Sequence, residues 1–243
     1  MPPSKTTVPA MALASYGFSA ALLAVSCVAS AASASEVADL SDINSKCIES
    51  QLQDCEVLTA GFINYEDSEQ KGEPRLAWQT QSGSTSEEGT LGGFVLFEHD
   101  DQGWQLLDAH FDGWFSAPTL NETGLLHISG VGSGTGGANA DRLYQWRDAE
   151  DASGGEGWRE IDLHKWWDTI EGLLPTDLEI RKGVAYDFHY PWETPVAFTP
   201  LWRPDDAQCC PQGGEAIISF EITDDQLVAT KVRPLPSEEE DAP

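Results

Sequence analysis

Basic residues are scarce in this chain. Its 243 residues include only 13 Lys and Arg against 41 Asp and Glu, which gives a formal net charge of −28. Such a surface repels the phosphates of nucleic acids and the headgroups of anionic lipids, so neither is an expected partner. The acidity fits a salty environment, where screening shortens the reach of self-repulsion. An acidic cation-binding surface is the alternative interpretation.

Long apolar runs are missing beyond the N-terminus. Lys5 is the only charged residue before position 36, Met11–Val25 is apolar, and Ala32–Ala34 has the small-x-small form of a signal-peptidase site. We therefore expect residues 1–34 to be a signal peptide. The mature chain should then be periplasmic or secreted, with no transmembrane segment.

Cysteine is also rare, with five residues in the chain. Cys27 lies in the expected signal peptide and loosely resembles a lipobox cysteine, so a lipid anchor is the less favoured alternative. Cys47, Cys55, Cys209 and Cys210 remain, and an even count in an exported chain favours two disulfides in one of three pairings. An unbroken helix would separate the first two by about 12 Å, so that segment should fold back, and we favour a local Cys47–Cys55 bridge. The spacing does not match a zinc site, and no metal is expected.

Most of the mature chain has the patterns of short strands bounded by turn residues. Two hairpins are clearest: Gly93–Glu98 with Trp104–Asp108, and Ala216–Ile222 with Leu227–Val232. Ser82–Thr90 is predicted as a flexible acidic loop. Further strands are expected at Glu56–Tyr65, Arg75–Gln81, Trp114–Ala117, Gly124–Ser129, Arg142–Arg147, Trp158–Ile161, Leu178–Lys182, Ala185–His189 and Pro195–Trp202.

One stretch, Asp162–Leu174, has the spacing of an amphipathic α-helix. Asp162 is a good N-cap, and Pro175 should end the helix. His164 and Asp168 lie off the apolar stripe and should be exposed. The stripe, which we expect to pack on a sheet, consists of Leu163, Trp166, Trp167, Ile170, Leu173 and Leu174.

The expected fold is α+β and β-rich, a mostly antiparallel sheet with one or two packed helices. A second, short helix is expected within Ser35–Asp54. Residues 35–233 should form a single exported domain. Pro234–Pro243 is acidic and rich in proline, so it should be a disordered tail.

A glycine-rich stretch, GVGSGTGG, is the first candidate binding element. Gly132, Gly134 and Gly137 fit the G-x-G-x-x-G spacing, but no helix follows, so no nucleotide cofactor is expected. The backbone N–H groups of such a loop can still approach a ligand closely.

The second candidate is the segment DFHYPWE. Asp187 and Glu193 are a pair of carboxylates of the kind that glycosidases use. His189, Tyr190 and Trp192 lie between them and suit a glycan or protein ligand, because aromatic side chains pack on sugars and dominate protein contacts.

These candidates leave two functional classes. The favoured one is an exported non-enzymatic domain that binds a protein or a glycan, since neither G-x-S-x-G nor H-E-x-x-H occurs. The alternative is a secreted, glycosidase-like hydrolase that uses Asp187 and Glu193. Two carboxylates converging in a cleft would favour the hydrolase.

Pro200–Gly214, PLWRPDDAQCCPQGG, combines Trp, Pro, two adjacent cysteines and two glycines in one turn. It resembles the CCP-x-GG turn of small exported bacterial proteins, including an actinobacterial lipoprotein family. LAWQTQ, GTGGANADRLYQW and TPLWRPDDAQCCPQGG also resemble uncharacterised exported proteobacterial proteins. The resemblance implies export and carries no activity. We expect a structural rather than a redox role for the turn, because no C-x-x-C motif is present.

Overall fold

The structure is a computed structural model that describes residues 37–63, 76–87, 89–133, 139–147, 156–181, 183–189 and 194–235. The chain divides into two units, Met1–Ala34 and Ser35–Pro243, and only the second contains described residues. The expected signal peptide and Cys27 therefore lie outside the described residues. No helix in the described part is long and apolar enough to cross a membrane.

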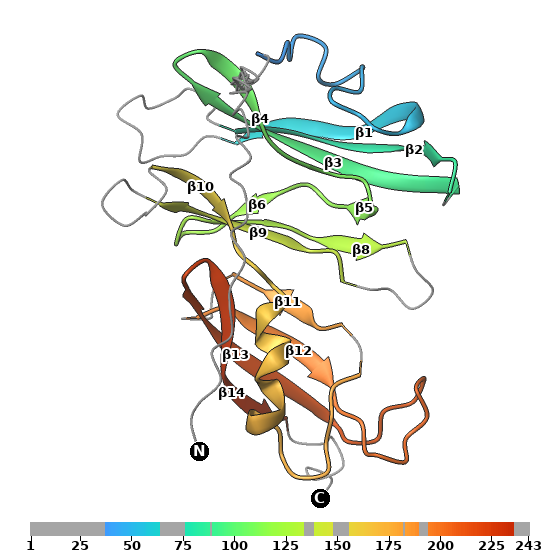
Figure 1. The fold of residues 1–243 in the computed structure, drawn as a ribbon, viewed down its shortest axis with the longest axis vertical. Helices are drawn as coiled ribbons and strands as arrows, with labels where there is room; N and C mark the ends of the chain where they lie inside the picture. The colour runs from blue at the N-terminus through green and yellow to red at the C-terminus, as the bar shows by residue number, and fades with distance from the viewer. Residues whose placement is uncertain are drawn as a thin grey trace, which may run out of the picture. The chain divides into compact units, whose positions relative to one another are not determined.

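The described residues form a mostly antiparallel β fold with four sheets (Figure 1). Sheet A has the order β1-β2-β3-β4, with strands Gln53–Ile63, Leu76–Thr85, Gly89–Asp100 and Gly103–His110. Sheet B pairs β5 with β8, Gly113–Phe115 and Gly130–Gly132. Sheet C has the order β10-β9-β7-β6, with strands Gly157–Glu160, Arg142–Arg147, Leu125–Ile128 and Thr119–Leu120. Sheet D has the order β11-β12-β13-β14, with strands Ala185–Asp187, Val196–Pro200, Glu215–Thr223 and Gln226–Pro234.

The two predicted hairpins are confirmed as β3–β4 and β13–β14. Other strand predictions need correction. Ser82–Thr90 is not a loop, because β2 continues to Thr85 and pairs there with Gly89, the first residue of β3. Of the strand expected at Leu178–Lys182, the described residues 178–181 make only an isolated bridge, between Glu179 and Trp202. The short strands β6 and β8 were not predicted, since two or three residues are too few to show alternation.

The predicted α-helix at Asp162–Leu174 is wrong. The chain forms two 3₁₀-helices, η1 Lys165–Asp168 and η2 Ile170–Leu173, separated at Thr169 with φ −121°. Main-chain hydrogen bonds to sheet D explain the difference: Asp162 N donates to Asp225 O at 2.9 Å, and Leu227 N donates to Asp162 O at 2.9 Å. Tertiary pairing therefore fixes the start of the segment in an extended conformation.

The mostly antiparallel, β-rich part of the expected fold class is confirmed, but the expected packed α-helices are wrong. No α-helix occurs in the described residues, and the short helix expected within Ser35–Asp54 is absent from residues 37–54, where a turn and irregular chain precede the start of β1 at Gln53. Three side chains of the amphipathic stripe are nevertheless buried, since Leu163, Trp166 and Ile170 are 3%, 1% and 3% exposed. Apolar spacing thus predicted three of the buried side chains, but Leu173 of the same stripe is 36% exposed, and the predicted helix type was wrong.

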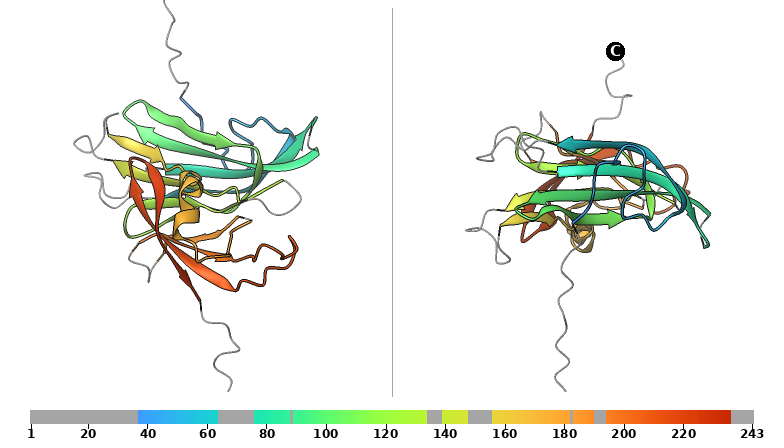
Figure 2. Two further views of the ribbon diagram at one scale, coloured as in Figure 1. Left: turned by 60° about the horizontal axis from the view of Figure 1, so that its bottom comes forward. Right: turned by 90° about the horizontal axis from the view of Figure 1, so that it is seen from above.

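Three hydrophobic clusters define the layers of the domain. One joins side chains of sheet A, such as Phe94, to side chains of sheet C, such as Tyr144. A second joins sheet C, through Leu143, to sheet D and to Trp166 of η1. The third covers the other face of sheet A with a segment that we call the N-terminal strap, residues 37–52. Sheet C therefore lies between sheets A and D, as Figure 1 and the left view of Figure 2 show.

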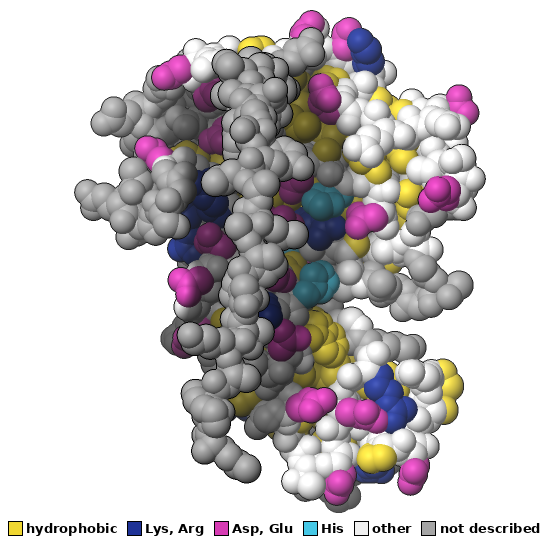
Figure 3. Space-filling model, in the orientation of Figure 1, with side chains coloured by type: hydrophobic (Ala, Val, Ile, Leu, Met, Phe, Trp, Pro, Cys, Tyr) yellow, Lys and Arg dark blue, Asp and Glu magenta, His cyan; other side chains and the backbone are white. Residues whose placement is uncertain are grey.

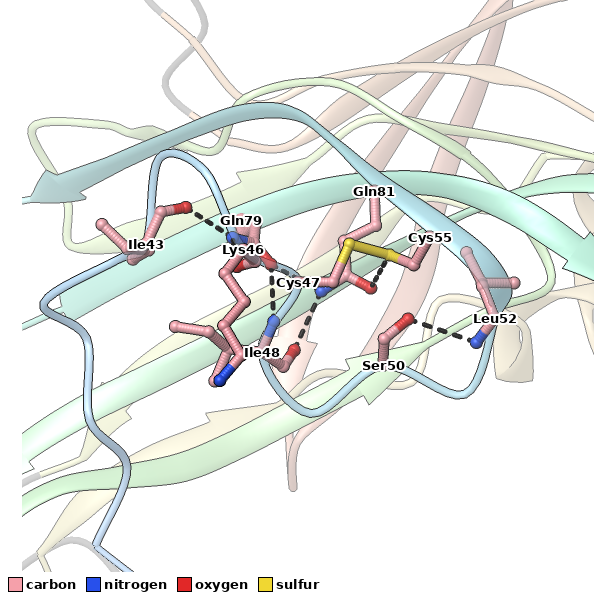
Figure 4. The surroundings of a disulfide bond; sticks show 9 residues. All are labelled: Ile43, Lys46, Cys47, Ile48, Ser50, Leu52, Cys55, Gln79 and Gln81. Carbon is pink, nitrogen blue, oxygen red and sulfur yellow. Dashed lines mark hydrogen bonds between the residues drawn. A yellow bond between two sulfur atoms is a disulfide. The ribbon is translucent and has the colours of Figure 1, made fainter.

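Two buried glutamines hold the strap on sheet A (Figure 4). Gln79 Nε2 donates to Ile43 O and, at 2.9 Å, to Lys46 O, while its Oε1 accepts from Ile48 N at 3.0 Å. Gln81 Nε2 donates to Ile48 O at 2.9 Å. Both glutamines are fully buried, so the middle of β2 is not the half-buried strand that its polar residues predicted.

The favoured local pairing of Cys47 with Cys55 is confirmed, with their Cα atoms 6.2 Å apart. The chain folds back between them, as the geometry of a disulfide requires. The sulfurs of Cys209 and Cys210 are also bonded to each other, as a bridge between adjacent residues.

At the other end of the domain, β14 extends to Pro234 and Leu235 N donates to Glu215 O at 2.8 Å, while 236–243 lie outside the described residues.

Candidate functional site

The sequence-predicted site residues do not form one described site. Gly132 ends β8, where it pairs with Gly113 of β5, while Gly134 and Gly137 lie outside the described residues. Asp187 Oδ1 accepts from His189 N at 2.9 Å, and the exposed His189 ring lies with Nε2 3.2 Å from Thr119 Oγ1. Tyr190, Trp192 and Glu193 also lie outside the described residues, so the proposed carboxylate pair stays a prediction.

His164 and Asp168 are both exposed, as expected. They do not act together in the structure. Asp168 Oδ2 accepts from Lys165 Nζ at 2.8 Å, and the ion pair is solvent-exposed on both sides. An exposed pair of this kind contributes little to stability and gives no sign of a metal site.

The site with the strongest chemistry is a pocket of about 330 Å³ where sheets C and D meet, which we call the carboxylate pocket. Acidic side chains dominate its lining, and Arg142 and His164 are the groups able to carry positive charge in it. Figure 3 shows the same imbalance more widely, since acidic side chains outnumber basic ones on the face drawn. The five carboxylates of the pocket belong to Asp141, Glu160, Asp162, Asp224 and Asp225.

One wall of the carboxylate pocket is built by main-chain pairing. Asp162 forms a parallel bridge with Gln226, which places it beside the β13–β14 turn. Asp224 and Asp225 in that turn have φ of 51° and 57°, the left-handed conformation that two-residue hairpin turns require. Arg147 donates to Asp225 Oδ1 through Nε at 3.1 Å and Nη2 at 3.0 Å. The wall is therefore rigid, and one of its carboxylates is already paired.

The opposite wall contains the buried Asp141. Its Oδ1 accepts from Gly130 N at 2.6 Å, and its Oδ2 accepts from Asn139 Nδ2 at 2.8 Å. His127 Nε2 lies 3.6 Å from the same Oδ2. Burial raises the pKa of Asp141, but the nearby His127 ring and the hydrogen bonds from Gly130 and Asn139 outweigh that effect, so the pKa is below its ordinary value. Asp141 is therefore an ionised carboxylate at neutral pH.

Arg142 connects the carboxylate pocket to a second polar cluster between sheets A and C. Its Nη2 lies 3.0 Å from His110 Nδ1 and 3.1 Å from Asp112 Oδ2. Asp108 Oδ2 lies 3.3 Å from His110 Nε2 and accepts from the Tyr144 hydroxyl at 2.6 Å. The ring of His110 also stacks on Phe94, which lies in the core between the two sheets.

This second cluster has the residue types of a metal site, because ligand atoms of Asp108, His110 and Glu160 lie within 4.8 Å of one another. The hydrogen bonds of His110 argue against metal binding. A guanidinium only donates, so His110 Nδ1 must accept from Arg142, and the proton of the neutral ring must be on Nε2. The Nε2–H points at Asp108 and leaves no lone pair for a metal ion. The cluster is instead a polar link between sheets A and C.

The hydrogen bonds of this cluster also shift the pKa of Asp108. Burial raises this pKa, but hydrogen bonds from His110 and Tyr144 outweigh the effect of burial. The pKa of Asp108 is therefore lowered, and its carboxylate stays ionised at pH values below its ordinary pKa. Burial also raises the pKa of Tyr144, and the charge of Asp108 adds to the increase. Tyr144 therefore remains a neutral donor at every physiological pH.

Sequence reasoning did not find the carboxylate pocket. Its residues come from three segments, near 141–142, 160–164 and 224–226. Antiparallel pairing of β9 with β10 joins the first two, and main-chain pairing of Asp162 with the β13–β14 turn joins the third. The paired acids Asp224-Asp225 are typical of turns, and a sequence offers no sign that this turn borders a cavity. Comparison of the chain with protein-family models, curated proteins and solved structures found no match.

Proposed function

We propose that this chain is an exported, non-enzymatic binding domain, and that its carboxylate pocket receives a Lys or Arg side chain of a protein partner. The observation that carries the proposal is the lining of the pocket: five acidic residues line a space of about 330 Å³, and Arg142 is the one permanent cation among the lining residues. That volume is near the lower end for ligand pockets and suits a single side chain.

Charge complementarity selects a basic ligand. Carboxylates gathered in a partly enclosed space repel one another, and a cation placed among them relieves that repulsion. A neutral glycan would bring hydroxyl donors but no compensating charge. The strongly negative chain would also speed the approach of a basic partner, since long-range attraction raises association rates. A protein ligand is therefore favoured over a glycan.

The protonation states support binding over hydrolysis. Each described carboxyl with a shifted pKa, namely Asp39, Asp108, Asp141 and Asp206, has it lowered. A glycosidase needs one carboxyl whose pKa is raised, so that it can act as the general acid. The alternative hydrolase, with Asp187 and Glu193, stays a prediction because Glu193 lies outside the described residues.

The two bridged cysteine pairs are consistent with an oxidising compartment, where disulfides form and persist. Together with the signal-like N-terminus, they support export. Intact-mass measurement of the protein purified from its native envelope should find a chain that starts at Ser35. A full-length chain recovered from the cytoplasm would contradict export.

The binding proposal is tested by calorimetry with a lysine-rich peptide and two matched double variants. Asp162→Asn with Asp224→Asn removes two charges from the pocket. Asp100→Asn with Asp101→Asn removes two charges from the β3–β4 turn, so the net charge of the two proteins is the same. We expect the pocket variant to weaken binding about tenfold more than the control variant, a difference of about 1.4 kcal/mol.

Equal weakening in the two variants would contradict the proposal, because it would show attraction by net charge alone. A glycan array run with the same proteins decides the ligand class. A glycan that binds the wild type and the turn variant but not the pocket variant would replace the basic side chain as the ligand.

A further inference from the structure

The CCP turn, residues 201–214, is held in shape by hydrogen bonds that do not involve sulfur. At its base, Leu201 N donates to Gly214 O at 2.8 Å and Gly213 N donates to Leu201 O at 2.9 Å. Across its middle, Asp206 Oδ2 accepts from Arg203 N at 2.7 Å and from Gln212 N at 2.8 Å. One carboxylate thus joins the two sides of the turn.

Arg181 supports the CCP turn from a neighbouring segment. Its Nη1 donates to Asp206 O at 2.5 Å, and its Nη2 donates to Arg203 O and to Pro204 O, both at 3.0 Å. Glu179 accepts from the same guanidinium and fixes its orientation. Three carbonyl groups of the turn are therefore satisfied by one side chain, and the turn would keep its shape without a bond between the cysteines.

The bridge between Cys209 and Cys210 adds little to this scaffold. The residues are adjacent, so the bridge closes no intervening loop and removes little entropy from the unfolded chain. Both residues are exposed. The Cys47–Cys55 bridge differs in loop length and in burial. Its cysteines are eight positions apart and partly buried. Gln81 Oε1 also lies 3.4 Å from Cys55 Sγ.

From this contrast we infer that Cys209 and Cys210 form a reversible thiol–disulfide exchange site for an external dithiol, whereas Cys47–Cys55 is a structural bridge. A thiolate of the dithiol attacks one of the two exposed sulfurs, forms a mixed disulfide, and releases the other cysteine, which takes up a proton. The second thiol of the dithiol then attacks the mixed disulfide and releases the remaining cysteine. Two electrons pass to the pair, and the dithiol leaves as its own disulfide.

The test uses the intact folded protein. Samples are equilibrated with increasing dithiothreitol, free thiols are trapped by iodoacetamide, and labelled peptides are measured by mass spectrometry. We expect Cys209 and Cys210 to be labelled at a concentration about tenfold or more below that needed for Cys47 and Cys55. The circular dichroism spectrum should not change in that range, and oxidised glutathione should restore the bridge after the reductant is removed.

Two double variants complete the test. Cys209→Ser with Cys210→Ser should remove the early labelling step and leave the urea midpoint unchanged, while Cys47→Ser with Cys55→Ser should lower the midpoint. Three results would each overturn the inference: labelling of all four cysteines only on unfolding, labelling of Cys209 and Cys210 without reductant, or an equal loss of stability in the two variants. The first would make both bridges structural, and the second would show that the pair is not oxidised.

Discussion

Replacing Trp166 by Ala should destabilise the domain more than any other single change in the 162–174 segment. The Trp166 side chain is 1% exposed and packs between Trp167, with ring centroids 4.3 Å apart, and Phe220, at 5.4 Å. Its Nε1 donates to the Tyr186 hydroxyl at 2.9 Å, and that hydroxyl donates to Leu163 O at 2.8 Å. The substitution therefore opens a cavity between η1 and sheet D and breaks a buried hydrogen bond.

The expected loss is about 3–5 kcal/mol, the usual range for Trp→Ala in a core. Trp166→Phe keeps most of the packing and removes the hydrogen bond, so it should cost about 1–2 kcal/mol. Urea unfolding followed by circular dichroism measures both values. In a domain of this size, the Ala variant should also lower the melting temperature by about 6–20 °C.

Two other tryptophans provide controls for Trp166. Trp167 is only partly buried and stacks on one face of Trp166, so Trp167→Ala should cost less than Trp166→Ala. Trp114 is 42% exposed, and Trp114→Ala should cost under about 1 kcal/mol. If Trp167→Ala proved as costly as Trp166→Ala, the assignment of Trp166 as the central side chain of this cluster would be refuted.

Further predictions concern the turn, the strap and the response to acid. Gly213→Ala should cost about 1–3 kcal/mol in urea unfolding because its Cβ would lie 2.6 Å from a backbone carbonyl, whereas Gly172→Ala meets nothing within 4 Å and should not destabilise. Gln79→Leu should leave buried strap groups unsatisfied, cost at least about 2 kcal/mol, and speed amide exchange across the N-terminal strap. The pKa of Asp108 and of Asp141 is lower in the folded state than the ordinary 3.8, so the unfolded chain binds more protons in acid. The urea midpoint should therefore be constant above about pH 5 and fall as the pH drops through 3.8 and below, and Asp141→Asn should reduce that slope.

Local patterns predicted much of the strand content and the Cys47–Cys55 bridge. Both hairpins have alternating side chains around a turn, and those signals depend only on neighbouring residues. The geometry of a disulfide was sufficient to exclude a continuous helix between Cys47 and Cys55. These successes share one cause, since each depends on contacts within about ten residues.

The wrong or missing predictions share the opposite cause, because each involves contacts between residues far apart in the sequence. The 162–174 segment has helical spacing, but its hydrogen bonds to Asp225 and Leu227 come from more than fifty residues away. Gln79 and Gln81 look like the polar face of a half-buried strand, but the strap covers them and uses their amides. The carboxylate pocket likewise depends on pairing between distant segments, such as that of Asp162 with Gln226. A sequence does not reveal such pairings without knowledge of the tertiary fold.

The position of sheet C between sheets A and D limits which fragments of this chain can stay folded after cleavage. A fragment that ends before Ala185 would lack sheet D and expose Leu143 and its neighbours to water, and a fragment that begins after His110 would expose Tyr144 on the other face. Neither piece would keep a closed core. We therefore expect no partial fold to survive cleavage between the sheets, and chaperones and proteases would meet this chain as either whole or unfolded.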